Sequence, residues 1–151
     1  MKPCISLGSY DTELIVDYDT AKAQVLLTSQ PARQFMLQPF IEEIRTKGEI
    51  SIVFIVGQYS HAVRKVPKDG DFRAQPEFKS RVTKYEVTPH YMTICYNILG
   101  YIGRKFGTLL YARIDFIDCE EPLLLELELI EPCLYFKYHP AAVDDLIGAM
   151  I

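Results

Sequence analysis

Residues 111–132 read YARIDFIDCEEPLLLELELIEP, two largely apolar runs separated by a short polar segment. Within each run, charged and apolar residues alternate with the period of a β-strand, which puts the charged side chains of each strand on one face. The stretch therefore predicts an antiparallel hairpin. If Asp118 pairs with Leu123 across a four-residue turn, Asp115 lies opposite Glu126 on the same face of the sheet.

The predicted hairpin gathers carboxylates around a single point. The same register puts Arg113 opposite Glu128, beside the pair formed by Asp115 and Glu126. Like charges directly opposed on a sheet destabilise it, so three converging carboxylates suggest a cation that compensates them. Ligands that are all oxygen point to Mg²⁺ or Mn²⁺, and the predicted ligands are Asp115, Glu126 and Glu128. The alternative is an ordinary half-solvated strand with surface ion pairs worth about 0 to 1 kcal/mol each.

The composition predicts a globular chain. Its 151 residues, 49% of them hydrophobic, are enough for one domain with a sizeable core or for two small lobes. A formal net charge of -4 without a Lys/Arg run argues against a nucleic-acid surface. The four cysteines stand far apart without a CxxC pair, which fits reduced thiols. No apolar run is long enough to span a bilayer and no signal peptide is evident, so we expect a cytoplasmic protein.

The rest of the chain predicts alternating strands and helices. Extended segments are expected at 2–7, 14–16, 34–39 and 81–88, and a hairpin over 50–66 that turns near Gly57 and Gln58. Helices are expected after a cap at Asp19 or Thr20 and ending at Pro31, from Pro89 to about Phe106, and in the closing segment that includes Ala142. Residues 41–49 predict a charged bend, and residues 67–75 a polar loop.

Five segments, in this order along the chain, resemble the ATP-grasp superfamily of carboxylate–amine (or thiol) ligases. They are KPCISLGSYDT (2–12), QPFIEEI with GEISIVFI (38–55), YSHAVRKVPKDGDFRAQ (59–75), YARIDFI (111–117) and LLLELELIEP (123–132). Their combination is similar to bacterial proteins related to glutathione synthetase and to the cycloserine-pathway ligases. The resemblance implies an α+β ATP-grasp fold, incomplete at the N-terminus, with antiparallel-rich sheets and helices packed on one face. Residues 1–41 would be the remnant of a first lobe with phosphate loop and hinge, and residues 42–151 a second lobe with the metal site.

The resemblance also implies a set of nucleotide-binding residues. These are Lys2 on the α and β phosphates, Ser6 and Gly8 in a loop over the phosphates, Gln38, Phe40 and Ile41 in the hinge against adenine, Glu49 on the ribose hydroxyls, and Lys65 on the phosphates. A lysine suits polyphosphate oxygens as a point charge, and small loop residues let backbone N–H groups approach an anion. An ordinary hairpin turn around Gly8 and a solvated Glu49 at a strand start are the alternatives.

Two arginines take catalytic roles in the resemblance. Arg113 would lie near the transferred phosphoryl group and the substrate carboxylate, and Arg73 would reach the phosphates or the acyl-phosphate, in a loop held by Asp71 and Gln75. Many relatives have Glu-x-Asn where this chain has Glu126-Leu-Glu128, so which of Glu126, Glu128 and Glu131 ligate the metal is left open. His61 receives no role, because a lone strand histidine is more often a packed side chain than a catalyst.

The function implied by the resemblance is ATP-dependent amide-bond formation. ATP phosphorylates a carboxylate to an acyl-phosphate, and an amine displaces the phosphate. The cofactors are ATP and Mg²⁺ (or Mn²⁺), the partners are small-molecule carboxylate and amine substrates, and a homodimer is left open. Such ligases normally carry a substrate domain ahead of the strand bearing Lys2, so we expect the chain to be the C-terminal part of a longer ligase, inactive alone. The alternatives are a non-catalytic ATP-binding or scaffold protein and a plain structural domain.

Overall fold

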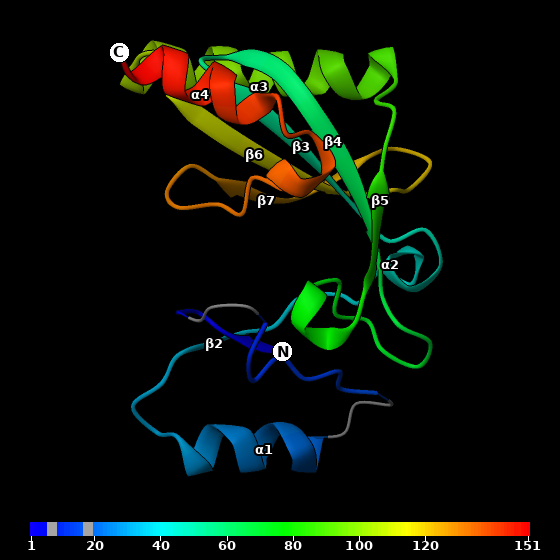
Figure 1. Cartoon of the computed structure of the whole chain (residues 1–151). Helices are drawn as coiled ribbons and strands as arrows, with labels where there is room; N and C mark the ends of the chain where they lie inside the picture. The colour runs from blue at the N-terminus through cyan, green and yellow to red at the C-terminus, as the bar shows by residue number, and fades with distance from the viewer. Residues whose placement is uncertain (6–8, 17–19) are drawn as a thin grey trace. The chain divides into compact units, whose positions relative to one another are not determined.

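An antiparallel sheet of order β5-β4-β3-β6-β7 dominates the computed structural model, which describes residues 1–5, 9–16 and 20–151 (Figure 1). Its strands are β3 (Glu49–Ile55), β4 (Gln58–Val66), β5 (Arg81–Lys84), β6 (Tyr111–Ile117) and β7 (Leu123–Glu128). The sheet belongs to the larger of two compact units, residues 43–151; the smaller comprises residues 1–42. Helices combined with antiparallel sheets make this an α+β fold, as predicted.

The smaller unit contains a two-stranded sheet and one helix. β1 (Lys2–Pro3) pairs antiparallel with β2 (Phe35–Met36), where longer extended segments were predicted. α1 (Thr20–Ser29) ends before Pro31 as predicted, and none of its side chains is buried. The strand predicted at 14–16 is wrong, because residues 12–16 have no regular structure.

One face of the large sheet forms the hydrophobic core with α3 (Pro89–Phe106). Pro89 occupies the first helical turn, where its missing N–H is no loss, and the chain leaves the helix at Gly107 with φ 77°. The helix buries Tyr91, Cys95 and Ile102. Together with inward residues of β3, β4 and β6 these side chains hold α3 on that face.

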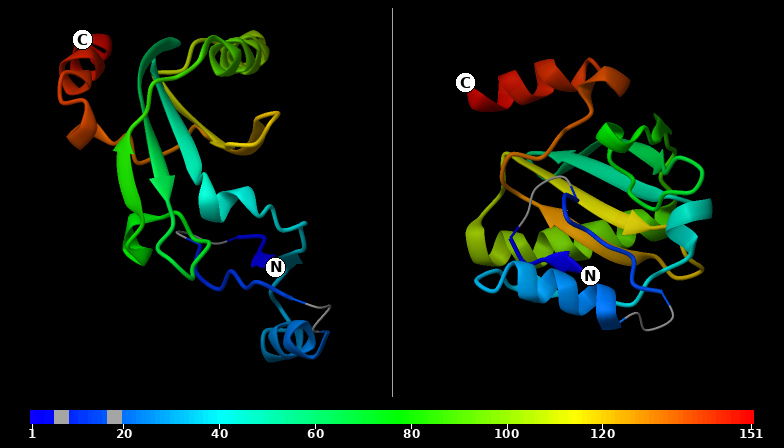
Figure 2. Two further views of the ribbon diagram at one scale, coloured as in Figure 1. Left: turned by 90° about the vertical axis from the view of Figure 1, so that its right-hand side faces the viewer. Right: turned by 90° about the horizontal axis from the view of Figure 1, so that it is seen from below.

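The opposite face carries polar and charged side chains and is covered in part by the C-terminal segment. That segment continues from β7 through a short 3-10 turn (Phe136–Tyr138) into α4 (Ala142–Met150). Two views show α3 and α4 on opposite sides of the sheet (Figure 2), so the prediction that the helices pack on one face is wrong. Ala142 at the start of α4 is fully buried. The sheet therefore separates an apolar core from a face on which ionisable groups are partly screened from water.

The hairpin of β6 and β7 has the predicted pairing where the charged residues lie. Asp115 is opposite Glu126 and Arg113 is opposite Glu128. The predicted pair of Asp118 with Leu123 is wrong, because a β-bulge between Asp115 and Phe116 shifts the register and pairs Ile117 with Leu123. The bulge absorbs one residue of β7 without turning the charged side chains to the other face.

The other connections follow the sequence closely. The hairpin of β3 and β4 turns at Val56 and Gly57, one residue before the predicted turn near Gly57 and Gln58, since Gln58 already pairs with Ile55. The bend expected over 41–49 contains one helical turn, α2 (Glu43–Thr46), and the extended segment expected over 81–88 is regular only in β5. Residues 67–75 form a loop that leads into a 3-10 turn at Pro76–Phe78. Among the helices of the described residues, none is long and apolar enough to cross a bilayer.

Candidate functional site

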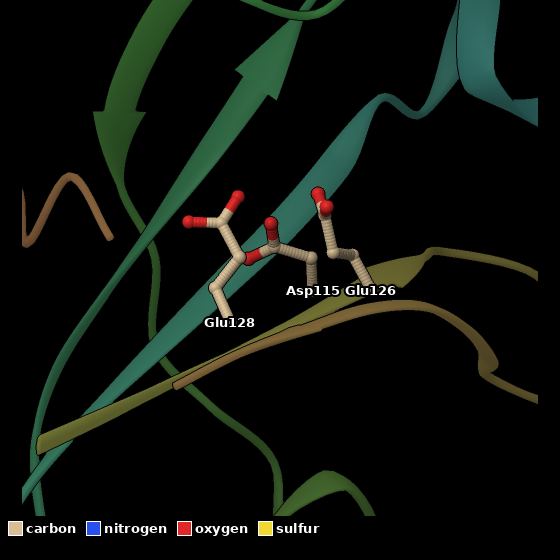
Figure 3. Close-up of side chains that lie close together, drawn as sticks. All are labelled: Asp115, Glu126 and Glu128. Carbon is tan, nitrogen blue, oxygen red and sulfur yellow. The ribbon is translucent and has the colours of Figure 1, made fainter. Parts of the chain in front are cut away.

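Three carboxylates meet on the polar face of the sheet at the hairpin of β6 and β7 (Figure 3). One oxygen from each of Asp115, Glu126 and Glu128 lies within 4.8 Å of the others. Asp115 comes from the central strand β6 and is fully buried, Glu128 is half-buried, and Glu126 is exposed. The group therefore runs from the sheet interior to solvent, which leaves it an open side.

The donor set of this acidic trio (Asp115, Glu126 and Glu128) fits a hard divalent cation, because all of its donor atoms are carboxylate oxygens. Ser51 on β3 lies directly opposite Asp115. Its buried hydroxyl has no hydrogen bond of normal geometry within the described part of the chain, although it is close enough to help lower the pKa of Asp115. Glu131, the other carboxylate left open by the sequence, is exposed and lies outside this group of described residues.

Arg113 is bound directly to two members of the acidic trio. Its Nη2 donates to Asp115 Oδ2 at 2.8 Å and to Glu128 Oε1 at 2.6 Å, and its Nε lies 3.0 and 3.1 Å from the two Asp115 oxygens. Nη1 donates to the Cys133 carbonyl oxygen at 3.1 Å. The Arg113 side chain is only 6% exposed. The guanidinium is thus a buried counter-charge to the carboxylates.

Lys65 on β4 provides a second buried cation. Its ammonium group is paired with Glu49, directly opposite on β3, and lies 3.8 Å from Asp115 Oδ2. Burial opposes its charge, but Asp115 and Glu49 outweigh that effect and hold the pKa of Lys65 above its usual value. Glu49, the residue predicted to bind the ribose hydroxyls, is thus 4% exposed and bound to Lys65. It is not solvated at a strand start, which was the alternative.

The carboxylates of the cluster differ in how readily they ionise. Burial raises the pKa of Glu49 to about 7, with Lys65 opposing the shift and Asp115 adding to it. Burial also raises the pKa of Glu128, and its neighbour Glu126 adds to the increase while Arg113 opposes it. At Asp115 burial is outweighed by Lys65 and Arg113, so its pKa stays below the usual value. Of Glu49, Glu128 and Asp115, the carboxylate most firmly held in the ionised form that a metal requires is therefore Asp115.

The segment after β7 closes over these cations, a feature that the sequence did not predict. The ring centroid of Tyr135 lies 5.7 Å from both Lys65 Nζ and Arg113 Cζ. Two carbonyl oxygens of the segment are also bound from the sheet: Arg113 binds that of Cys133, and His61 Nε2 lies 2.8 Å from that of Leu134. His61 has thus a structural role. The left-handed conformation of Tyr135, at φ 51°, turns the chain at this point.

Arg73 lies in the loop that follows β4. Asp71 accepts hydrogen bonds from the Phe72 and Arg73 backbone N–H groups and from the Arg73 side chain, with Nη2 at 2.8 Å. The Arg73 guanidinium also lies 3.7 Å from the centroid of the Phe78 ring. These contacts confirm the loop-holding role predicted for Asp71. The catalytic role of Arg73 stays a prediction.

The remaining predicted nucleotide residues belong to the smaller unit. Lys2 lies in β1, opposite Met36 in β2. Gln38, Phe40 and Ile41 follow β2 in an irregular segment, where Gln38 and Phe40 are exposed and Ile41 is half-buried. Ser6 and Gly8, predicted in the phosphate loop, lie outside the described residues. The contacts of these residues with a nucleotide stay predictions.

Comparison with known proteins gives a coherent result. The family model described as "Prokaryotic glutathione synthetase, ATP-grasp domain" matches residues 7–136. No curated protein sequence is significantly similar to the chain. The structure is similar to that of a D-cycloserine synthetase, with a TM-score of 0.63 and 24% identity over 75% of this chain and 40% of that one. It is also similar to a D-alanine–D-alanine ligase from Bacillus anthracis complexed with ATP, with a TM-score of 0.53 and 14% identity over 87% of this chain and 45% of that one. The chain thus spans less than half the length of these solved proteins.

Proposed function

Because the chain belongs to the family of prokaryotic glutathione synthetase ATP-grasp domains, we propose that it acts as the ATP-grasp domain of a carboxylate–amine ligase. The ligase forms an amide bond through an acyl-phosphate made with ATP. In this proposal residues 1–41 belong to the first ATP-grasp lobe and residues 42–151 to the second. Small-molecule carboxylate and amine are the substrates of the whole enzyme.

The observation that carries this proposal is the acidic trio facing two buried cations. Asp115, Glu126 and Glu128 would hold Mg²⁺ or Mn²⁺, whose bound charge would neutralise the phosphate oxygens of ATP during phosphoryl transfer. Lys65 and Arg113 lie beside these carboxylates on the same face of the sheet. Phosphoryl transfer depends mainly on positioning and charge neutralisation, which these groups supply without a nucleophilic side chain.

Each cationic residue has its own part in the proposed reaction. Lys65 contacts the nucleotide phosphates, and Arg113 binds the transferred phosphoryl group and the substrate carboxylate through N–H donors suited to planar or tetrahedral oxyanions. Arg73 reaches the phosphates from the loop that Asp71 holds. From the smaller unit, Lys2, Ser6 and Gly8 contact the phosphates, while Gln38, Phe40 and Ile41 contact adenine. Glu49 binds the ribose hydroxyls.

The direct test is to neutralise the ligands one at a time. In the ligase that contains this chain, Asp115→Asn and Glu126→Gln should each abolish ATP-dependent phosphate release, because each removes a charge that holds the cation. Glu120→Gln, an exposed glutamate in the turn of the same hairpin, is the matched control and should leave phosphate release unchanged. Full activity in both trio variants would refute the metal-site assignment.

A thermal-shift measurement separates the ligase from a non-catalytic ATP-binding protein. A ligand at 100 times its dissociation constant adds about 2.7 kcal/mol of stability, so a Mg²⁺-dependent shift with a non-hydrolysable ATP analogue is expected. A shift without substrate-stimulated phosphate release would favour the non-catalytic alternative. No shift would leave a plain structural domain.

We also place the protein in the cytoplasm, since ATP is abundant there and all four cysteines are free thiols.

A further inference from the structure

Arg113 is hydrogen-bonded to two of the three carboxylates that would ligate the metal. Its Nη2 bridges Asp115 Oδ2 and Glu128 Oε1 at 2.8 and 2.6 Å, so one amino group touches two of the three predicted ligands. The oxygens of the acidic trio lie within 4.8 Å of one another, and three like charges at that spacing repel strongly where one of them is fully buried. A cation between them offsets this repulsion. Arg113 supplies that cation within the chain itself.

We propose that Arg113 is a resident counter-cation of the metal site, which gives up Glu128 when a divalent ion binds and then offers the freed Nη2 N–H to the anion beside that ion. The inference rests on the proposed function, because it takes the acidic trio as the metal site. The new element in the inference is that binding of the metal and release of the Arg113 Nη2 from Glu128 depend on each other. Two cations a few ångströms apart repel, so guanidinium and metal compete for Glu128 rather than share it.

Arg113 has a second set of contacts that would keep it in place after this exchange. Nη1 donates to the Cys133 carbonyl oxygen at 3.1 Å, and the guanidinium carbon lies 5.7 Å from the centroid of the Tyr135 ring. Neither contact involves the acidic trio. The segment after β7 can therefore hold the Arg113 head near the site while Nη2 changes partners.

The opposing interpretation is that Arg113 is a scaffold for the metal ligands. In that case its hydrogen bonds hold Asp115 and Glu128 in a metal-binding arrangement, and removing them would weaken metal binding. Competition predicts the reverse, since removing Arg113 leaves one more uncompensated negative charge next to the ion. The two interpretations therefore predict opposite changes in metal affinity, which makes the proposal testable without any catalytic assay.

The test is to titrate Mn²⁺ alone into the 151-residue chain and to follow free Mn²⁺ by electron paramagnetic resonance. Arg113→Gln should lower the dissociation constant of Mn²⁺ about tenfold or more. The double variant Arg113→Gln/Glu126→Gln should lose this gain if the ion sits at the acidic trio. Arg64→Gln is the matched control: Arg64 is bound to Asp118 at 2.6 Å and lies opposite the core residue Ile50, on the other face of the sheet. It removes the same charge and should leave the dissociation constant unchanged.

A second measurement keeps the proposal falsifiable if Arg113→Gln fails to fold, as judged by near-ultraviolet circular dichroism. In the wild-type chain, the Arg113 side-chain N–H resonances should shift and exchange faster with water as Mg²⁺ is added. Weaker Mn²⁺ binding by folded Arg113→Gln, or Arg113 resonances unchanged at saturating Mg²⁺, would overturn the inference. If neither the wild type nor Arg113→Gln binds Mn²⁺, the metal site of the proposed function is itself refuted, which is a distinct result.

Discussion

Gly48 is the residue that lets β3 begin beside the Lys65 backbone. It has a φ of 79°, and a Cβ placed on it would lie 2.3 Å from the Lys65 carbonyl oxygen. Both the conformation and the contact exclude a side chain. Gly48 therefore sets the start of the strand that carries Glu49 and Ser51, next to the residues of the proposed site.

Gly48→Ala should destabilise the chain by about 2 to 4 kcal/mol, because strain at positive φ adds to a clash with backbone that cannot move aside. Urea denaturation gives the free energy of unfolding. Gly70→Ala is the matched control, since Gly70 has a similar φ of 82° but open space where the Cβ would be. Its effect should be about 1 kcal/mol. Equal losses in the two variants would contradict the clash at Gly48.

His61 makes the free energy of unfolding depend on pH. Its Nε2 must donate to the Leu134 carbonyl oxygen, so in the neutral ring Nδ1 accepts the Ser60 hydroxyl hydrogen at 2.9 Å. Burial lowers the pKa of His61, and the hydrogen bond to the Leu134 carbonyl oxygen opposes this shift only in part. His139, whose ring centroid lies 5.2 Å away, and Lys84 also lower the pKa. The unfolded chain therefore binds a proton more readily than the folded chain. Stability from His61 is fully present above its ordinary pKa near 6.5 and is lost as the pH falls below that value.

The measurement is urea denaturation of the wild type and His61→Gln between pH 5 and 8. The wild type should lose stability relative to the variant on acidification, with a slope of at most about 1.4 kcal/mol per pH unit. Comparing the two proteins cancels the contribution of Glu49, which has the opposite pH dependence. Because the pKa of Glu49 is raised in the folded chain, the stability that it contributes is present at low pH and is lost as the pH rises through about 7. The exposed His90 provides a control, and His90→Gln should follow the wild type. Parallel curves for all three proteins would refute the role of His61.

Among the helices and strands, α3 contains a position where a single substitution should raise the stability of the chain. Gly103 lies in its last turns, exposed, and a Cβ there would have nothing within 4 Å. Glycine inside a helix is less favourable than alanine because the unfolded chain gains more freedom. Gly103→Ala should therefore stabilise the chain by about 0.5 to 1 kcal/mol, measured as the urea-dependent free energy of unfolding. A destabilised variant would show that this part of α3 requires glycine.

Elements with strong local signals were predictable. α3 has proline at its start and glycine after its end, and β3 with β4 has a glycine turn between two apolar runs, so local chemistry specifies both. The segment at 14–16 is apolar but too short to form a strand without a partner, and among the described residues of this segment no ladder forms. The bulge in β7 also escaped prediction, because alternation of side chains fixes which face they take but not the residue at which a register shifts.

The hydrophobic core of the whole molecule lies in its larger unit. The buried core cluster runs from Ile50 to Phe116 and is formed by β3, β4, β6 and α3. A separately expressed chain of residues 43–151 should thus unfold in urea as one cooperative transition, with a midpoint close to that of the main transition of the full chain. A gradual, non-cooperative loss of circular dichroism would show that residues 1–42 are needed to complete the core.

The candidate site was predictable where its residues are neighbours in one hairpin, and hidden where it depends on distant parts of the chain. Asp115, Glu126 and Glu128 follow from strand alternation across a short turn. The contact of His61 with the Leu134 carbonyl joins positions 73 residues apart, and no local pattern announces it. Tyr135 could have been noticed only as an aromatic residue close after the last glutamates. Its place against two cations depends on how the C-terminal segment crosses the sheet.

The bulge between Asp115 and Phe116 lies between the carboxylates and the tip of their own hairpin. Strand pairing on the tip side is therefore offset by one residue from pairing on the carboxylate side. Residues 118–122 lie between the two strands, so insertions or deletions there lengthen or shorten the turn without changing the partner of Glu126. Homologous hairpins can accordingly evolve loops of different length and composition while the acidic side chains keep their mutual spacing.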